Sequence, residues 1–285
     1  MKSLVVYKLV SAVAVGASQL EENAFTECGT FEASRSGWSP TIEDGFTMEL
    51  TGGVQVLRFT TQVKVPNKAE VKRRVNSAVE AYVLEFGNKP NKSEMTTMEA
   101  EVKEALIPLT PANEPKHFTV VISPTNVYVE GGYKQAELIL ANLRAILGSL
   151  PVLPLELATD TSKKLTDMVK DEINTDKFVL GDKVAYITSD ELKVSQTSGS
   201  VYGSDAVTHV EDGATVTSLQ LEYNSFTLFT LKDDLSLAGI KFSKDLTSDV
   251  EDGNQVTSVI LQVTELINLV DDLVLEFGGL VSKEA

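Results

Sequence analysis

The spacing of apolar residues changes from a strand period to a helix period within the first third of the chain. Val5, Tyr7 and Leu9 alternate with other residues, which is typical of a half-buried strand. The stretch from Val54 to Val65 is rich in β-branched and aromatic residues and predicts a second strand, which Pro66 ends. The segments 24–30 and 36–40 between them are rich in turn-forming residues.

Two helices joined by a polar linker are predicted after Pro66. Asn67 and Glu70 have the spacing of a capping box, and apolar residues follow at helical intervals. The linker G-N-K-P-N-K-S leads to a second helix that ends near Pro108. The residues expected to face inward are Val71, Val75, Ala78, Val79, Tyr82, Phe86, Met95, Met98, Val102 and Leu106. The two stretches together predict a helical hairpin.

The centre of the chain predicts two strands, a helix and an extended connection. The strands cover 118–122 and 126–130, and the apolar stripe of the helix stops at Gly148, a residue suited to the left-handed conformation after a last turn. In S-L-P-V-L-P-L, which follows, Pro151 and Pro154 prevent the helix from resuming. Because its leucines and valine are too apolar for an ordinary loop, we expect a buried, rigid crossing segment.

Beyond residue 159 the pattern predicts mainly strands. Short apolar runs cover 184–187, 192–194, 215–223, 226–231 and 238–242. V-E-D-G-A-T-V-T-S-L at 210–219 returns as V-E-D-G-N-Q-V-T-S-V at 250–259, and each copy predicts a turn and then a strand rather than a calcium loop. A final helix is expected to be capped by Thr264 and to end at Gly278, with Leu266, Ile267, Val270, Leu273 and Val274 facing inward. The fold class is therefore α+β with mixed or antiparallel sheets.

Charge is distributed unevenly along the 285 residues. The chain has 25 basic and 41 acidic residues and a net charge of -16, an average that argues against nucleic acid or an anionic membrane as partner. Between Arg58 and Lys92, however, eight basic residues face three acidic ones. Two interpretations remain open for this segment, a solvated face and a surface that binds phosphates.

The sequence indicates no catalytic or metal site. Cys28, His117 and His209 are too far apart to form a metal-ligand cluster, and the histidines lie in turn-like contexts. No phosphate loop, dinucleotide fingerprint or nucleophile elbow is present, so we assign no catalytic residue and expect no cofactor. Trp38 in S-G-W-S-P is interpreted as a packing anchor, with base stacking as the alternative. Lys8 interrupts the N-terminal apolar run, so a strand is favoured over a signal peptide.

A series of short motifs in a fixed order resembles the RdgC family of recombination-associated proteins from bacteria and phages. They are L-V-V-Y-K-L, A-F-T-E-C-G, G-W-S-P, V-P, L-I-P, L-R-A-I-L-G-S-L-P-V-L-P-L, I-K-F-S-K-D-L and L-V-L-E-F-G-G. This resemblance implies a non-enzymatic α+β protein that forms a ring-shaped homodimer. The ring's positively lined hole would bind duplex DNA without sequence preference and limit loading of a recombinase. It also implies a cytoplasmic, nucleoid-associated protein with no membrane partner.

The resemblance, together with the basic excess between Arg58 and Lys92, predicts three regions and a set of site residues. A central region (1–66 and 109–158), a projecting helical arm (67–108) and a C-terminal base (159–285) are expected. The expected DNA-binding residues are Lys64, Lys68, Lys72, Arg73, Arg74, Lys89, Lys92, Lys193, Lys241 and Lys244. The family can carry arginine and phenylalanine at the dimer gate, where this chain has Leu109 and Pro111.

The chain departs from the family pattern in ways that weaken the DNA-binding expectation. Lys193 is the only basic residue in the stretch L-K-V-S-Q-T-S-G-S, where the family would be more basic. Two further hypotheses are therefore kept. One is a protein-interaction module of the same fold that has lost DNA binding and acts on recombination proteins through its acidic surface. The other is a nuclease or another enzyme.

Overall fold

The chain divides into two compact units. The computed structural model describes residues 1–42, 44–247 and 254–281. The first unit contains residues 1–17, 40–57 and 118–285, and the second contains residues 18–39 and 58–117. The expected division into a central region, an arm and a base has other boundaries and stays a prediction. The expected α+β class is confirmed, and the strands form a large antiparallel sheet.

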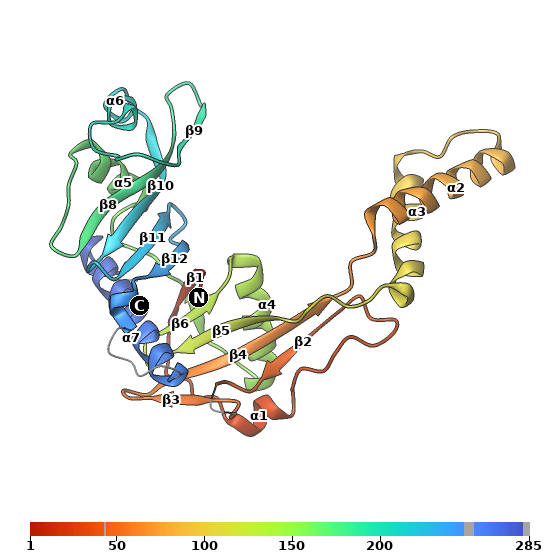
Figure 1. Ribbon diagram of the computed structural model, residues 1–285, viewed down its shortest axis with the longest axis horizontal. Coiled ribbons are helices and arrows are strands. Elements are labelled where there is room, and N and C mark those ends of the chain that lie inside the picture. The colour runs from red at the N-terminus through yellow and green to blue at the C-terminus, as the bar shows by residue number, and fades with distance from the viewer. Residues whose placement is uncertain (43, 248–253, 282–285) are drawn as a thin grey trace. The chain divides into compact units, whose positions relative to one another are not determined.

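An antiparallel sheet with the strand order β5-β6-β1-β12-β11-β10-β8-β9 forms the first unit (Figure 1). Its strands are β1 (Ser3–Leu9), β5 (Lys116–Ile122), β6 (Asn126–Glu130), β8 (Phe178–Ile187), β9 (Lys193–Gln196), β10 (Thr215–Tyr223), β11 (Thr227–Lys232) and β12 (Leu237–Phe242). β1 is central, because Val5 pairs with Val129 and Ser3 pairs with Ala238. Leu4 to Tyr7 are consequently buried on both faces, rather than on one face as the alternation predicted.

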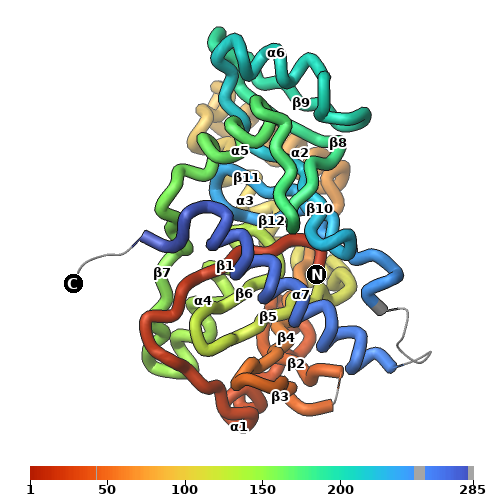
Figure 2. The backbone as a smooth tube through the Cα atoms, turned by 90° about the vertical axis from the view of Figure 1, so that its left-hand side faces the viewer, coloured from red at the N-terminus to blue at the C-terminus, as the bar shows by residue number. Residues whose placement is uncertain are grey.

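Helices cover both faces of this sheet. On one face lies α4 (Tyr133–Leu147), where Glu137 accepts a hydrogen bond from the hydroxyl of Tyr7 at 2.8 Å. Leu4 and Val6 point to the opposite face and share a core with α7 (Gln255–Glu276), which crosses the sheet in Figure 2. The same core includes α5 (Thr161–Lys170) and α6 (Asp205–Glu211), two helices that the sequence did not predict.

The connection after α4 is only partly buried. Gly148 has φ 75° and ends the helix, as predicted. Leu150 and Leu155 are buried, but Leu153 is 44% exposed, so the expectation of a buried segment is met only in part. The short strand β7 (Val152–Pro154) within it pairs with β1, and Leu153 and Pro154 are both exposed.

The second copy of the V-E-D-G repeat does not form the predicted strand. The first copy behaves as expected, since its turn leads into β10. In the second copy 250–253 lie outside the described residues, whereas 255–259 begin α7. The helix starts nine residues before the predicted cap at Thr264, and its cap is Asn254, which accepts a hydrogen bond from the backbone N–H of Thr257. Packing of Val263, Leu266, Val270 and Leu273 against the sheet favours the helix over local strand propensity.

The second unit combines strands with the long helices α2 and α3 (Figure 1). β2 (Ser34–Ser39) pairs with residues 58–63 of β4 (Val54–Val63), and the first residues of β4 pair with β3 (Met48–Leu50) in the first unit. α2 (Lys68–Phe86) and α3 (Lys92–Leu106) confirm the predicted helical hairpin. The remaining short helices are α1 (Ala17–Glu21), η1 (Ile107–Leu109) and η2 (Lys244–Thr247). Over the described ranges, no helix is long and apolar enough to cross a membrane.

Candidate nucleic-acid interface

The α2–α3 hairpin, residues 68–106, is capped by its own sequence. The side chain of Asn67 accepts hydrogen bonds from the backbone at Ala69 and Glu70, and Gly87 ends α2 with φ 72°. Asn91 and Glu94 form a complete capping box at the start of α3. Glu94 also accepts a hydrogen bond of 2.9 Å from the hydroxyl of Tyr82, which joins the two helices near their linker.

A small apolar core holds the two helices together at their other ends. Val71, Val75 and Leu106 are buried, and Val79 and Val102 pack against them. Of the other residues predicted to face inward, Met95 is 37% exposed and Phe86 is also exposed. The apolar faces of α2 and α3 therefore extend beyond their mutual contact, and part of the predicted hairpin core is open to solvent.

The predicted basic cluster on α2 is partly neutralised from within the helix. Arg73 and Arg74 each donate hydrogen bonds to the carboxylate of Glu70 at 2.7–2.8 Å. Bonds from Arg73 first and Arg74 second lower the pKa of Glu70 to about 2. The trio therefore carries a net charge of only +1.

Two lysines of α2 are in a different situation. Lys68 and Lys72 are exposed, and within the described part of the chain neither forms an ion pair. Lys64, by contrast, donates hydrogen bonds to the carbonyl oxygens of Gly29 and Thr30 at 2.8 and 2.9 Å. Lys64 therefore stabilises the loop around Gly29 and Thr30, whereas Lys68 and Lys72 are free to contact an anion directly.

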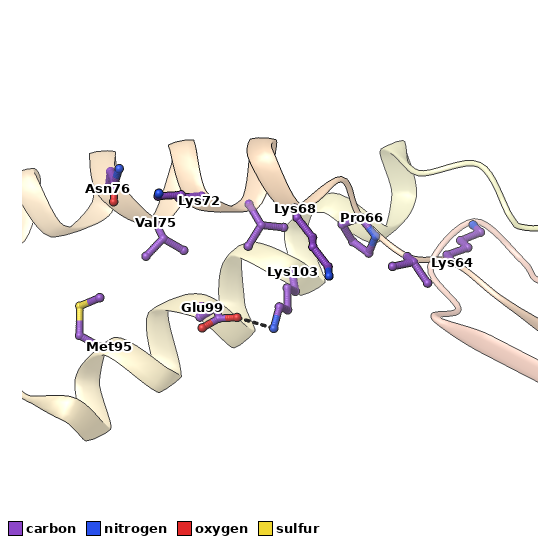
Figure 3. A pocket seen from close by; sticks show the side chains of 11 residues that line it. Lys64, Pro66, Lys68, Lys72, Val75, Asn76, Met95, Glu99 and Lys103 are labelled. Atoms are coloured by element: carbon purple, nitrogen blue, oxygen red, sulfur yellow. Dashed lines mark ion pairs between the residues drawn. The ribbon is translucent and has the colours of Figure 1, made fainter. Parts of the chain in front are cut away.

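A pocket of about 650 Å³ lies between α2 and α3 and reaches the segment that leads into α2 (Figure 3). Lys64, Lys68, Lys72 and Lys103 line it together with one acidic residue, Glu99. Lys103 forms an ion pair with Glu99 at 2.5 Å, so this carboxylate is compensated. The other lining residues are Val65, Pro66, Val71, Val75, Asn76 and Met95. This pocket was not predicted from the sequence, although Lys68, Lys72 and Asn76 have the spacing of one helix face.

The remaining predicted site residues lie in several places. Lys89 lies in the linker and Lys92 begins α3, and both are exposed. Leu109 in η1 and Pro111 after it are also exposed. Lys193 begins β9, Lys241 lies in β12 and Lys244 lies in η2, all three in the first unit. Of the predicted DNA-binding residues, Lys64, Lys68 and Lys72 lie around one pocket. The DNA-binding and dimer-gate roles of all the predicted site residues stay predictions.

Trp38 is a packing anchor, as predicted. Its side chain is 1% exposed and meets the ring of Phe59 edge-on, with 5.0 Å between ring centroids. A base therefore cannot stack on it in this conformation. The predicted turn contexts of the histidines were wrong, because pairing and helix formation extend further than local composition indicates: His117 lies in β5 and His209 in α6.

His117 is hydrogen-bonded across the second unit. Its Nδ1 lies 2.9 Å from the hydroxyl of Thr60, which also bonds to Ser39. Burial and the positive charge of Arg58 lower the pKa of His117. Within the described ranges, no three His, Cys, Asp or Glu side chains are grouped as metal ligands would be.

Comparison with known proteins places the chain in a class whose members are named recombination-associated proteins. Residues 1–280 match the family described as "Putative exonuclease, RdgC", and the chain belongs to this RdgC family. It is 30% identical over 261 residues to the recombination-associated protein RdgC of Proteus mirabilis, covering 86% of this chain and 84% of that protein. The protein of the same name from Yersinia enterocolitica is 28% identical over an alignment of 302 positions, which covers 98% of this chain and 97% of the relative.

Proposed function

We propose that this protein binds duplex DNA through its phosphates, without sequence preference, and acts in recombination by limiting the access of a recombinase to DNA. The active form in this proposal is a ring-shaped homodimer in which the α2–α3 hairpin serves as the projecting arm. Recombination is the process named in the relatives' description. DNA as the ligand and the ring as the assembly are the additional steps of the proposal.

The charge difference between the two units carries this proposal. The second unit has 11 basic and 12 acidic residues, so the first unit holds -15 of the net charge of -16. Because the acidic unit repels a polyanion, DNA would be directed to the second unit and above all to Lys68 and Lys72. Lysine ammonium groups on phosphates position a protein on DNA but carry no sequence information.

The acidic first unit also supports a second function. A unit with a net charge of -15 is suited to bind a basic partner protein. In this second function the protein has lost DNA binding and acts on a recombination protein instead. The two functions differ in one observable, which is whether the wild-type protein binds duplex DNA at low salt.

A salt titration of DNA affinity tests the first function. Each lysine that neutralises a phosphate adds roughly -0.9 to the slope of log affinity against log salt. We expect K68Q/K72Q to flatten the slope by roughly 1.8 units per bound protomer, equally for unrelated duplexes. Fluorescence anisotropy with two duplexes of different sequence measures the effect.

A matched pair of lysines provides the control. Lys163 and Lys170 are exposed on α5 in the acidic unit, so K163Q/K170Q removes the same charge. An equal slope change in both double variants would place the binding surface elsewhere. Absence of wild-type binding at low salt would favour the protein-interaction function, and magnesium-dependent shortening of labelled DNA would establish a nuclease.

A further inference from the structure

The pocket on the α2–α3 hairpin is a groove that follows both helices. Lys68, Lys72 and Asn76 lie on successive turns of α2, and Met95, Glu99 and Lys103 lie on successive turns of α3. The eight-residue span from Lys68 to Asn76 corresponds to about 12 Å of helix. A single extended peptide segment would cover this length in about four residues.

The apolar lining of the groove is not explained by binding to phosphates. Val75 and Met95 point into the space between the two helices (Figure 3). Met95 is 37% exposed, and Val65 at the other end of the groove is more exposed still. A phosphate needs only hydrogen-bond donors and positive charge, whereas apolar walls contribute when an apolar side chain is removed from water.

The positive charge of the groove favours a negatively charged ligand. Four lysines and one glutamate line it, for a net charge of +3 in a protein of net charge -16. Glu99 is paired with Lys103, so its charge does not offset that of the other lysines. Lys68 and Lys72 are exposed to solvent beside the apolar residues of the groove. An occupant that satisfies both features has carboxylates beside at least one large apolar side chain.

We propose that this groove binds a short acidic peptide segment of a partner protein, anchored by a leucine or phenylalanine side chain. The anchor lies against Val75 and Met95, and the flanking aspartates or glutamates pair with Lys68 and Lys72. The volume of about 650 Å³ lies within the range of roughly 300–1,000 Å³ found for specific ligand sites. This interaction goes beyond the proposed DNA binding and does not require it.

Binding of a labelled model peptide tests the proposal. The probe is the fluorescein-labelled peptide Asp-Leu-Asp-Asp-Phe-Asp, compared with Asn-Leu-Asn-Asn-Phe-Asn and Asp-Ser-Asp-Asp-Ser-Asp by fluorescence anisotropy. The full-length wild-type chain should bind the first peptide at least about tenfold more tightly than either control, because only the first offers both carboxylates and an anchor. Equal binding of the serine peptide would overturn the proposal, since it would indicate a general anion surface.

Variants of exposed residues locate the binding site. K68Q/K72Q should weaken binding of the first peptide by about tenfold or more, and M95Q by about fivefold. Leu84 on α2 is 87% exposed and does not line the groove, so L84Q is the matched control for M95Q. Equal effects of M95Q and L84Q would overturn the assignment to the groove.

Two further measurements distinguish peptide binding from DNA binding and from binding of a second copy of the chain. M95Q should retain wild-type affinity for duplex DNA. If the wild type binds duplex DNA but not the first peptide, the peptide proposal is refuted and the DNA proposal still stands. Light scattering on the same variants tests a second copy of the chain as occupant. If M95Q but not L84Q dissociates a wild-type oligomer, and the wild type binds no peptide, the groove is an interface between copies and the peptide proposal is wrong.

Discussion

A single glutamate decides how much of the basic cluster on α2 is available to a ligand. Glu70 lies three and four residues before Arg73 and Arg74, which is the spacing at which helical side chains meet. Its carboxylate occupies both guanidinium groups, although all three residues are at least partly exposed to solvent. Glu70 therefore competes with any phosphate for the arginines, while Lys68 and Lys72 have no such competitor.

Removing this carboxylate should strengthen DNA binding. We expect Glu70→Gln to bind duplex DNA severalfold more tightly at low salt and to steepen the salt slope by up to about two units, because both arginines become free for phosphates. Because the pKa of Glu70 is lowered to about 2, the wild-type pairing persists as the pH falls from 8 to about 4.

Fluorescence anisotropy over a salt series measures the effect, with Glu80→Gln as the control. Glu80 is an exposed glutamate of the same helix, so its substitution changes the net charge equally. Similar gains in the two variants would mean that only net charge matters and that the ion pairs of Glu70 have no specific role.

At the same scale, the packing role of Trp38 could be predicted and the pocket could not. A lone tryptophan beside glycine and proline is usually a packing anchor, and Trp38 is almost completely buried. The pocket depends on where α3 crosses α2, and side-chain spacing on one helix does not fix that crossing. The neutralisation by Glu70 could have been inferred from spacing alone, because its partners lie on the same helix.

Among the elements, α7 shows how packing overrides a local sequence signal. Residues of nearly the same sequence form a turn and strand before Leu219 and the first turns of a helix near Val259. Strand β10 gains hydrogen bonds from β8 and β11, whereas α7 buries Leu266, Val270 and Leu273 against the sheet. The sequence of either ten-residue copy alone cannot predict this difference, because it depends on packing partners that lie far away in the sequence.

Helix α7 carries three carboxylates whose pKa values shift in different directions. Burial, followed by repulsion from Asp272, raises the pKa of Asp271, and burial also raises the pKa of Glu265. Burial opposes ionisation of Asp272 as well, but bonds from Lys177 at 2.5 Å and Tyr223 at 2.6 Å outweigh it and lower its pKa.

These shifts predict a maximum in stability at mildly acidic pH. As the pH falls from 7 toward about 4.3, folded Glu265 and Asp271 take up protons before their unfolded counterparts, so the folded state gains stability. Below pH about 4, the unfolded chain takes up a proton at Asp272 more readily than the folded protein, in which the pKa of Asp272 is lowered. The contribution of ionised Asp272 to the stability of the folded state is therefore lost. Thermal unfolding followed by circular dichroism should therefore give a Tm that rises and then falls.

Two variants separate the two limbs of that curve. E265Q/D271N should reduce the rise in Tm between pH 7 and about 4.5, and Asp272→Asn should reduce the fall below about 4. Identical pH profiles for wild type and E265Q/D271N would show that general charge repulsion, and not these two side chains, produces the rise.

For the molecule as a whole, the separation of charge between the units is the main constraint on assembly. A first unit of -15 repels the same unit of another copy, whereas the second unit is close to neutral. Contacts between copies through the second unit are therefore the least opposed by charge. Leu109 in η1 is 69% exposed there and is available for such a contact.

We expect the protein to be a dimer in which Leu109 contributes to the contact. Light scattering at micromolar concentration should give twice the 30.9 kDa mass of one chain. Leu109→Asp should shift the equilibrium toward the monomer, because a charge at the centre of an apolar contact is unfavourable. Leu138→Asp, at an exposed leucine of α4, is the control. A monomeric wild type would contradict the dimer and with it the ring.

The central position of β1 has a consequence for how the first unit is made. Its neighbours in the sheet are β6, β7 and β12, and Ser3 can pair with Ala238 only after Ala238 has left the ribosome. Until then, part of one edge of an apolar strand has no partner, and an unpaired strand edge promotes association with other nascent chains. Synthesis of this unit therefore includes a long interval in which chaperone binding at β1 would protect the chain, and the late arrival of β12 ends that interval.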